Sequence, residues 1–146
     1  MPGEKSIVLL VDDEVLLLNA MRRMIGAADG LEVLTASTVA EARAAIDKVL
    51  ESGRQVDVLV SDGRLLQGES ARDVIRLAQE KGIPSSRTIV YTTGLALGAH
   101  DTWGQKLEED VRKVVPPENI LFEKPDFQPL RARIAALLGG DRHEIK

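Results

Sequence analysis

The sequence contains no cysteine and very few aromatic residues. None of its 146 residues is Cys, and Phe, Trp and Tyr together make up 3%. The absence of Cys excludes disulfides, thiolate metal sites and cysteine nucleophiles, and it fits a reducing compartment. Because aromatics are so scarce, the core must be built from aliphatic side chains.

Long apolar runs and an excess of positive charge are also missing. No run approaches the roughly 18 apolar residues of a membrane helix, and no signal peptide precedes Ile7. We therefore expect a cytoplasmic protein without membrane insertion. The formal net charge of −4 argues against general nucleic-acid binding, which depends on clustered Lys and Arg. A local basic patch remains compatible with this charge.

The remaining composition is typical of one globular domain. Hydrophobic residues make up 44% of the chain and charged residues 29%. A chain of this length can bury a core but is too short for two complete domains. We expect an N-terminal tail at 1–6, a single domain at 7–138 and a polar C-terminal tail at 139–146.

Short apolar runs alternate with helical patterns. A continuous apolar run at 7–11 predicts a strand buried on both faces. Further strands are predicted at 31–35, 56–60, 88–91 and 120–122. A helical pattern follows each strand, and the expected ends of the first four helices are Gly26, Gly53, Gly82 and Pro116. Five strands alternating with five helices predict a parallel sheet between helix layers, because parallel strands need crossover connections.

Polar side chains follow four of the predicted strands. They are Asp12 and Asp13, then Asp62, Thr93 and Lys124. Ligands of an open parallel sheet bind beyond the carboxyl ends of its strands, so we expect these side chains to converge. Each has a structural alternative, since Asp caps helices and begins turns and a lone Lys is usually solvated. Their coincidence at the strand ends favours a site.

Three carboxylates at one place predict a bound cation. Clustered carboxylates raise one another's pKa unless a positive charge compensates them. Oxygen ligands with room for water favour Mg²⁺. With a hydroxyl and an ammonium beside it, such a cation is typical of a phosphoryl-transfer site.

Four short motifs together resemble the receiver domain of two-component response regulators. They are VDDE after the first strand, LVSDG around Asp62, YTTG at the end of the fourth strand and FEKPDF across the fifth. The resemblance implies an α/β, flavodoxin-like (βα)5 fold. This fold is a doubly wound parallel sheet with strand order 2-1-3-4-5 in a three-layer sandwich.

The resemblance implies a Mg²⁺ site formed by four residues. Asp13 and Asp62 would bind the ion directly, and Asp12 would act through water. The backbone carbonyl of Arg64 would complete the protein ligands.

The resemblance also implies how the phosphoryl group is held. Asp62 would accept it from a phosphohistidine, and Lys124 would pair with it. Thr93, preferred to Thr92 because a glycine follows it, would hydrogen-bond a phosphoryl oxygen. The Lys124–Pro125 peptide bond is expected to be cis.

The implied function is that of a switch rather than of an enzyme acting on an external substrate. The domain would phosphorylate itself from a donor, dephosphorylate itself and alter a protein-interaction surface. The donor would be a histidine kinase or a histidine phosphotransfer protein. Output would pass to a downstream protein target or a fused output domain, and a homodimer through the fourth helix, fifth strand and fifth helix is a further arrangement. The chain would be a stand-alone regulator or a receiver from a hybrid kinase or larger regulator.

The loop after Asp62 departs from the family pattern. Leu66 stands where many receivers have proline, and Ser70 stands where they have glycine. We expect a reshaped loop in which Gly68 supplies the turn.

Two further departures lie between Thr93 and Lys124. Leu121 replaces the usual switch aromatic, and the segment is longer than is typical. Residues 94–104 are expected to form a glycine-rich loop. Trp103 within it would serve either as an interface anchor or as a cover for a helix end.

Two other functions remain as alternatives. One is a scaffold with the receiver fold that is never phosphorylated, which the altered loop after Asp62 favours and the intact Asp13, Asp62 and Lys124 oppose. The other is a haloacid-dehalogenase-like phosphohydrolase, which needs an Asp-x-Asp after the first strand that DDEV lacks. Nucleotide-binding folds fit less well, because no Gly-rich phosphate loop follows that strand.

Overall fold

The computed structural model describes residues 5–65, 68–92, 102–122 and 124–145. The side chains at 27–29, 102–105 and 140–145 lie outside this description. The strands are β1 (Ile7–Val11), β2 (Glu32–Ala36), β3 (Val58–Ser61), β4 (Thr88–Tyr91) and β5 (Ile120–Leu121). The helices are α1 (Val15–Asp29), α2 (Val39–Glu51), α3 (Ala71–Glu80), α4 (Thr102–Val114) and α5 (Phe127–Ile145), with short 3-10 helices η2 (Ser85–Arg87) and η3 (Pro117–Asn119).

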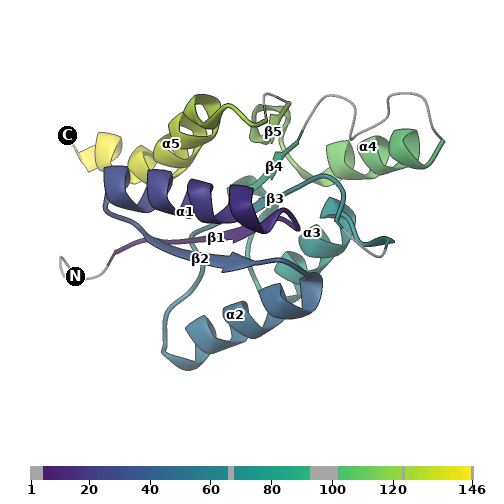
Figure 1. The fold of residues 1–146 in the computed structure, drawn as a ribbon. Helices are drawn as coiled ribbons and strands as arrows, with labels where there is room; N and C mark the ends of the chain where they lie inside the picture. Colours follow the sequence, from purple (N-terminus) through teal and green to yellow (C-terminus); the bar gives the residue numbers. More distant parts are fainter. Residues whose placement is uncertain (1–4, 66–67, 93–101, 123, 146) are drawn as a thin grey trace.

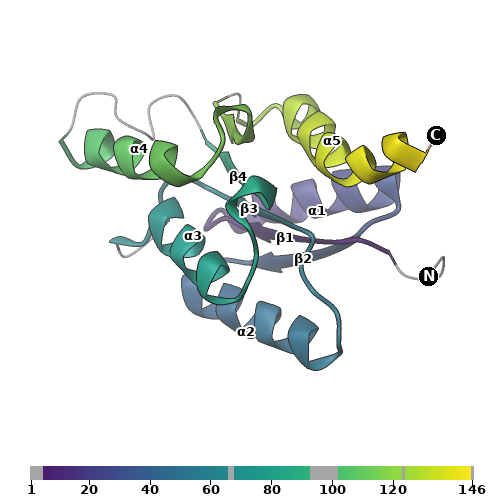
Figure 2. The ribbon, with the colours of Figure 1, turned by 180° about the vertical axis from the view of Figure 1, so that it is seen from behind.

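The five strands form one parallel sheet in the order β2-β1-β3-β4-β5. Strand order and fold class are therefore those implied by the resemblance. Helices cover both faces of the sheet, with α1 and α5 on one side and α2 and α3 on the other (Figures 1 and 2). This arrangement brings the carboxyl ends of β1, β3 and β4 to one edge, where the predicted site residues follow.

Alternate residues of β1 belong to different cores, because successive side chains of a strand point to opposite faces. Ile7 and Leu9 pack in the cluster that includes α2 and α3. Val8 and Leu10 pack in the cluster that includes α1 and α5. All five β1 residues are buried, which explains why this strand has no polar position.

The first helix is longer than its sequence predicts. Gly26 lies inside α1, and the helix ends at Gly30, whose φ of 64° is the left-handed conformation that glycine readily adopts. The Gly30 N–H donates to the Gly26 carbonyl over 3.1 Å. The helix buries Leu18 and Ile25, whereas Met24 is 46% exposed.

Two other helices are also longer than predicted. The last helix continues to Ile145, where a polar tail was expected from Gly139. Glycine disfavours a helix by only about 1 kcal/mol, and no proline follows to stop it. Helix α4 begins at Thr102, so residues 102–104 are helical where a loop was expected. Residues 94–101 and the Trp103 side chain lie outside the described residues.

Candidate functional site

Two neighbouring strands place Asp12 and Asp62 side by side. Val11, the last residue of β1, is in register with Ser61, the last residue of β3. Asp12 and Asp62 therefore leave the sheet at the same level. The Asp62 N–H donates to the Val11 carbonyl over 2.9 Å, which fixes the two carboxylates relative to each other.

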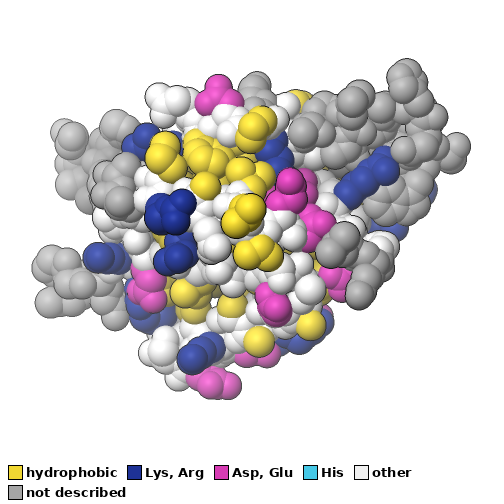
Figure 3. All heavy atoms as spheres, in the orientation of Figure 1, with side chains coloured by type: hydrophobic (Ala, Val, Ile, Leu, Met, Phe, Trp, Pro, Cys, Tyr) yellow, Lys and Arg dark blue, Asp and Glu magenta, His cyan; other side chains and the backbone are white. Residues whose placement is uncertain are grey.

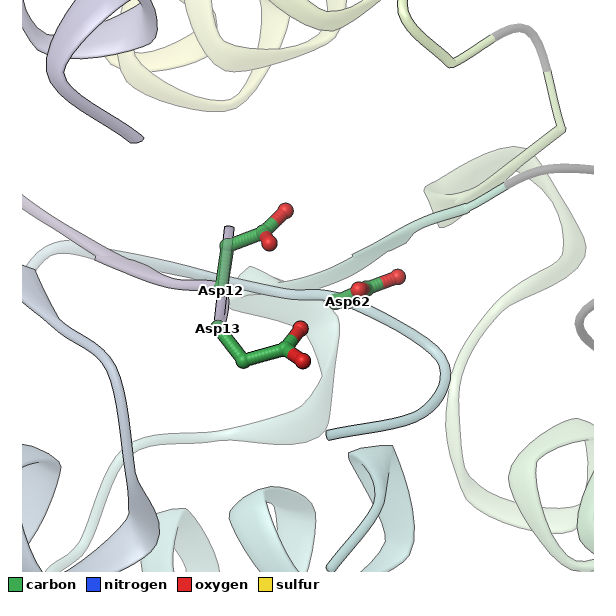
Figure 4. A group of neighbouring side chains, drawn as sticks. All are labelled: Asp12, Asp13 and Asp62. Atoms are coloured by element: carbon green, nitrogen blue, oxygen red, sulfur yellow. The ribbon is translucent and has the colours of Figure 1, made fainter. Parts of the chain in front are cut away.

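Asp13 completes a cluster of three carboxylates. Asp12, Asp13 and Asp62 each offer one oxygen atom, and these atoms lie within 4.8 Å of one another. Figure 4 shows their side chains directed into the same space beyond the strand ends. Asp12 and Asp62 are buried, whereas Asp13 is half-buried and gives the cluster an open side.

Lys124 joins this cluster from the far edge of the sheet. Its Nζ lies 2.7 Å from Asp12 Oδ2 and 3.0 Å from Asp62 Oδ2, and its side chain is only 6% exposed. Glu14, more exposed, lies 3.6 Å from the same nitrogen. The Lys124–Pro125 peptide bond is cis, as the resemblance implied. The buried ammonium thus bridges two carboxylates that would otherwise repel each other.

Burial and mutual repulsion control the protonation of the cluster. Burial, followed by the negative charge of Asp12, raises the pKa of Asp62 to about 6, although Lys124 opposes the shift. Burial likewise raises the pKa of Asp12 against the opposing bond to Lys124. Burial by itself would lower the pKa of Lys124, but the two carboxylates outweigh it and raise that pKa. The lysine remains charged at neutral pH and only partly compensates three acids.

The donor set fits a hard divalent cation. Carboxylate oxygens are the ligands that Mg²⁺ prefers, and the open side at Asp13 leaves room for the water that Mg²⁺ retains. The hydrogen bonds that these carboxylates accept do not prevent them from binding a cation. Asp12 Oδ1 accepts the Glu14 N–H over 2.8 Å, and Asp62 Oδ1 accepts the Gly63 N–H over 2.7 Å. Each carboxylate therefore has oxygen lone pairs left for an ion.

In the described part of the loop that contains Arg64, the turn lies at Gly68 as expected. Arg64 forms an isolated antiparallel bridge with Ser70, and Gly68 adopts a φ of 78° that supplies the turn. Ser70 caps α3 in a reciprocal capping box with Asp73. Serine thus replaces the expected glycine because it begins the next helix. The role of the Arg64 carbonyl as a metal ligand stays a prediction.

Two neighbouring threonines are candidates for the hydroxyl predicted at this site. Thr93, the predicted one, lies outside the described residues. Thr92 is fully buried, and its Oγ1 has no hydrogen-bond partner in the described part of the chain. Its carbonyl accepts the Lys124 N–H over 3.3 Å, which places it next to the lysine. Thr92 could have been found from the sequence, because it is a hydroxyl residue directly after the apolar strand β4.

The aromatic and apolar residues around β5 are mainly structural. Tyr91 is buried, and its hydroxyl donates to the Asp126 carbonyl over 2.7 Å. Leu121, at the position of the usual aromatic, is half-buried against the α1 and α5 core. Arg112 lies over the Phe122 ring at 5.9 Å from its centroid. Tyr91 and Phe122 belong to the packing of the fold.

Comparisons with known proteins agree with this architecture. No family model and no curated protein match the sequence. A receiver domain protein (CheY-like) from Methanospirillum hungatei JF-1 superposes with a TM-score of 0.69 at 16% identity, covering 97% of this chain and 99% of that chain. The chain has the fold of a response regulator receiver domain.

Two more solved structures extend the likeness. A receiver protein from Sinorhizobium medicae WSM419 is 25% identical, with a TM-score of 0.64 over 93% of this chain and 96% of that chain. A receiver domain protein from Clostridium thermocellum is 20% identical, with a TM-score of 0.66 over 95% and 98%. The receiver likeness thus spans nearly the whole chain. Among the described residues, no helix is both long and apolar enough to cross a membrane.

Proposed function

We propose that this chain is a phosphoryl-accepting receiver module with Asp62 as its acceptor. The observation that carries the proposal is the Lys124 ammonium, held 3.0 Å from Asp62 Oδ2 inside a cluster of three carboxylates. In a scaffold that binds neither cation nor phosphate, nothing would compensate this excess of buried negative charge, in which Asp12 helps to raise the pKa of Asp62. A site that binds a cation, and through the cation a phosphoryl group, needs that negative charge to hold the cation.

The transfer step follows from the position of Asp62. An ionised oxygen of Asp62 attacks the phosphorus of a phosphohistidine and forms an acyl phosphate. The P–N bond breaks, and its electron pair goes to the imidazole nitrogen, which takes up a proton. The Lys124 ammonium stabilises negative charge on the transferring group. Asp12, Asp13 and Asp62 would hold Mg²⁺, which supplies further positive charge to the phosphoryl oxygens.

A threonine hydroxyl donates to the phosphoryl group in this proposal. Thr93 is the residue that the resemblance selects, and Thr92 is a second candidate because its buried Oγ1 lacks a partner among the described residues. A hydroxyl bonded elsewhere would have to break that bond in order to move. In the described part of the chain, Thr92 makes no such bond that would have to break.

Modification at Asp62 would act on protein partners rather than on an external substrate. The phosphoryl donor is a histidine kinase or a histidine phosphotransfer protein, and the output is a protein target or a fused domain. The added charge would shift Lys124 and the threonine, and with them the surface of α4, β5 and α5. Self-association through that surface is part of the same proposal.

The proposal is tested by incubation with Mg²⁺ and acetyl phosphate, followed by intact mass measurement. We expect one acid-labile phosphoryl adduct that Asp62→Asn abolishes and EDTA prevents. Asp47→Asn is the matched control, because Asp47 is an α2 carboxylate paired at the surface with Lys81. An adduct that persists in Asp62→Asn refutes the acceptor. A folded wild type without any adduct supports the scaffold.

A further inference from the structure

In the described part of the chain, no strand pairs with the outer edge of β2. β2 lies at the end of the sheet, and its pairing with β1 uses the Glu32 N–H, which donates to Ser6, and the Ala36 carbonyl, which accepts from Asp12. Alternate residues of a parallel strand bond to opposite sides. Val33 and Thr35 therefore direct their N–H and C=O groups away from β1. Such an edge is a template for one more strand.

A groove runs along this edge between two helices. It has a volume of about 690 Å³, and its lining includes Val33 and Leu34 of β2 with Ala45 and Val49 of α2. A second hollow of about 390 Å³ shares Arg22 and Val33 with it and extends toward α1. An extended chain entering the groove would meet apolar side chains on both sides of the exposed strand edge.

The groove is strongly basic although the protein is acidic. Four cationic side chains and one carboxylate line the two hollows: Arg22, Arg23, Lys48 and Arg54 against Glu32. Glu32 is already paired with Arg54 over 2.8 Å. Within the described ranges, Arg22 and Lys48 make no ion pair. Figure 3 shows Lys and Arg side chains on the face where Figure 1 places α1, β2 and α2.

We propose that the β2 edge binds an extended acidic peptide as a sixth strand. Main-chain hydrogen bonds to Val33 and Thr35 would hold the peptide, and alternating acidic and apolar side chains would match the basic rim and the apolar lining. A second copy of this chain is a poorer occupant, because two-fold pairing of β2 would bring two basic rims together. This interaction is separate from phosphorylation at Asp62.

The first test uses fluorescence anisotropy with a labelled heptapeptide of alternating Glu and Val. We expect saturable binding to the full chain, and slower hydrogen exchange of the Val33 and Thr35 amides in the complex. The matched probes are the same peptide N-methylated on every residue, which loses its hydrogen-bond donors on both edges but not its charge, and a Lys-Val heptapeptide. Neither is expected to bind. Equal binding of the N-methylated peptide would overturn strand addition, and equal binding of the Lys-Val peptide would overturn charge recognition.

The second test changes the basic rim. The double variant Arg22→Glu/Lys48→Glu is expected to weaken peptide binding by about tenfold or more, since two exposed attractions become repulsions. The control Arg76→Glu/Lys113→Glu reverses exposed charges on α3 and α4 and should bind as the wild type does. Asp62→Asn should also bind normally, which separates this proposal from phosphoryl transfer.

Three results would overturn the proposal. One is the absence of binding to the folded wild type at millimolar peptide. Another is a wild-type dimer, detected by sedimentation, that the rim variant dissociates, because the occupant would then be a second copy. The third is aggregation of the rim variant together with no peptide binding by the wild type. The basic side chains would then only prevent the β2 edges of two molecules from pairing.

Discussion

Lys124 shows how one side chain sets the character of the site. A buried ammonium is stable only when opposite charges and hydrogen bonds replace its water shell. Asp12 and Asp62 supply both at 2.7 and 3.0 Å. One lysine does not neutralise three carboxylates, so the cluster still attracts a cation. These contacts stabilise the ionised carboxylates within the fold, and the negative charge that they leave uncompensated favours a metal ion.

Thr92 provides a stability prediction at the same scale. Its buried hydroxyl has lost water without gaining a partner among the described residues, and such a group destabilises a fold by roughly 1–3 kcal/mol. Thr92→Val keeps the shape and removes the hydroxyl. We expect the free energy of unfolding in urea to rise by about 1 kcal/mol.

Thr88 is the matched control for Thr92. It is also a buried threonine of β4, but its Oγ1 donates to the Pro84 carbonyl at 3.3 Å. Thr88→Val should therefore lower the free energy of unfolding. Equal destabilisation by both substitutions would show that Thr92 has a partner in the native protein.

Among the elements, η3 depends on one buried amide. Asn119 Nδ2 donates to the carbonyls of Ser86 and Thr88 over 3.1 Å, and its Oδ1 accepts from Arg133 Nε over 2.6 Å. The residue is fully buried. It joins η2 and β4 to α5 and holds the start of β5, from which Lys124 follows.

Asn119→Ala should therefore weaken the fold and the site together. We expect a loss of about 2–4 kcal/mol in the free energy of unfolding, because three hydrogen bonds disappear and the buried Thr88 carbonyl loses a donor. Asn119→Asp keeps the acceptor for Arg133 but puts a carboxylate oxygen where Nδ2 donates to two carbonyls, so it should also weaken the fold. Asn19→Ala is the control, since Asn19 lies half-buried on α1 with no side-chain hydrogen bond in the described chain. A loss no larger than in the control would contradict this role.

At the scale of the molecule, the site makes folding depend on pH. The pKa of Asp62 is about 6 in the folded protein against an ordinary value of 3.8. Between these values the folded state binds a proton that the unfolded state has released, so the contribution of Asp62 to stability is greatest below pH 4 and falls as the pH rises through 6. Asp12, whose pKa is also raised, acts in the same direction. Lys124, whose pKa is raised, loses its contribution only in strongly alkaline solution.

The variant Asp62→Asn isolates this effect. Without divalent cations, we expect its free energy of unfolding to exceed that of the wild type by roughly 1–3 kcal/mol at pH 7.5, and the difference to vanish near pH 4. Surface acids with lowered pKa values, such as Glu41 and Glu80, contribute equally to both proteins and cancel. Mg²⁺ should stabilise the wild type more than the variant. A difference that does not change with pH would contradict the assignment of the shift to Asp62.

Local pattern was enough to predict most elements of the fold. The apolar run of β1, buried along its whole length, and the fourth strand were predicted within the observed bounds. The ends of α1 and α5 were wrong, because Gly26 and Gly139 are tolerated in helices that packing holds. Strand order came from the resemblance rather than from periodicity, since local pattern does not say which strands pair.

The chemistry available to this protein can be read from its sequence, which has three acids and a lysine close after strands, no thiols and few aromatics. The tertiary structure shows that Lys124 bridges Asp12 and Asp62, which could not be predicted because the contact joins segments that follow different strands of the sheet. It also decided that the hydroxyl of Thr92 is buried without a bond in the described chain, and that basic residues of α1 and α2 flank the open edge of β2. These features depend on distances between segments remote in the sequence, which local periodicity does not specify.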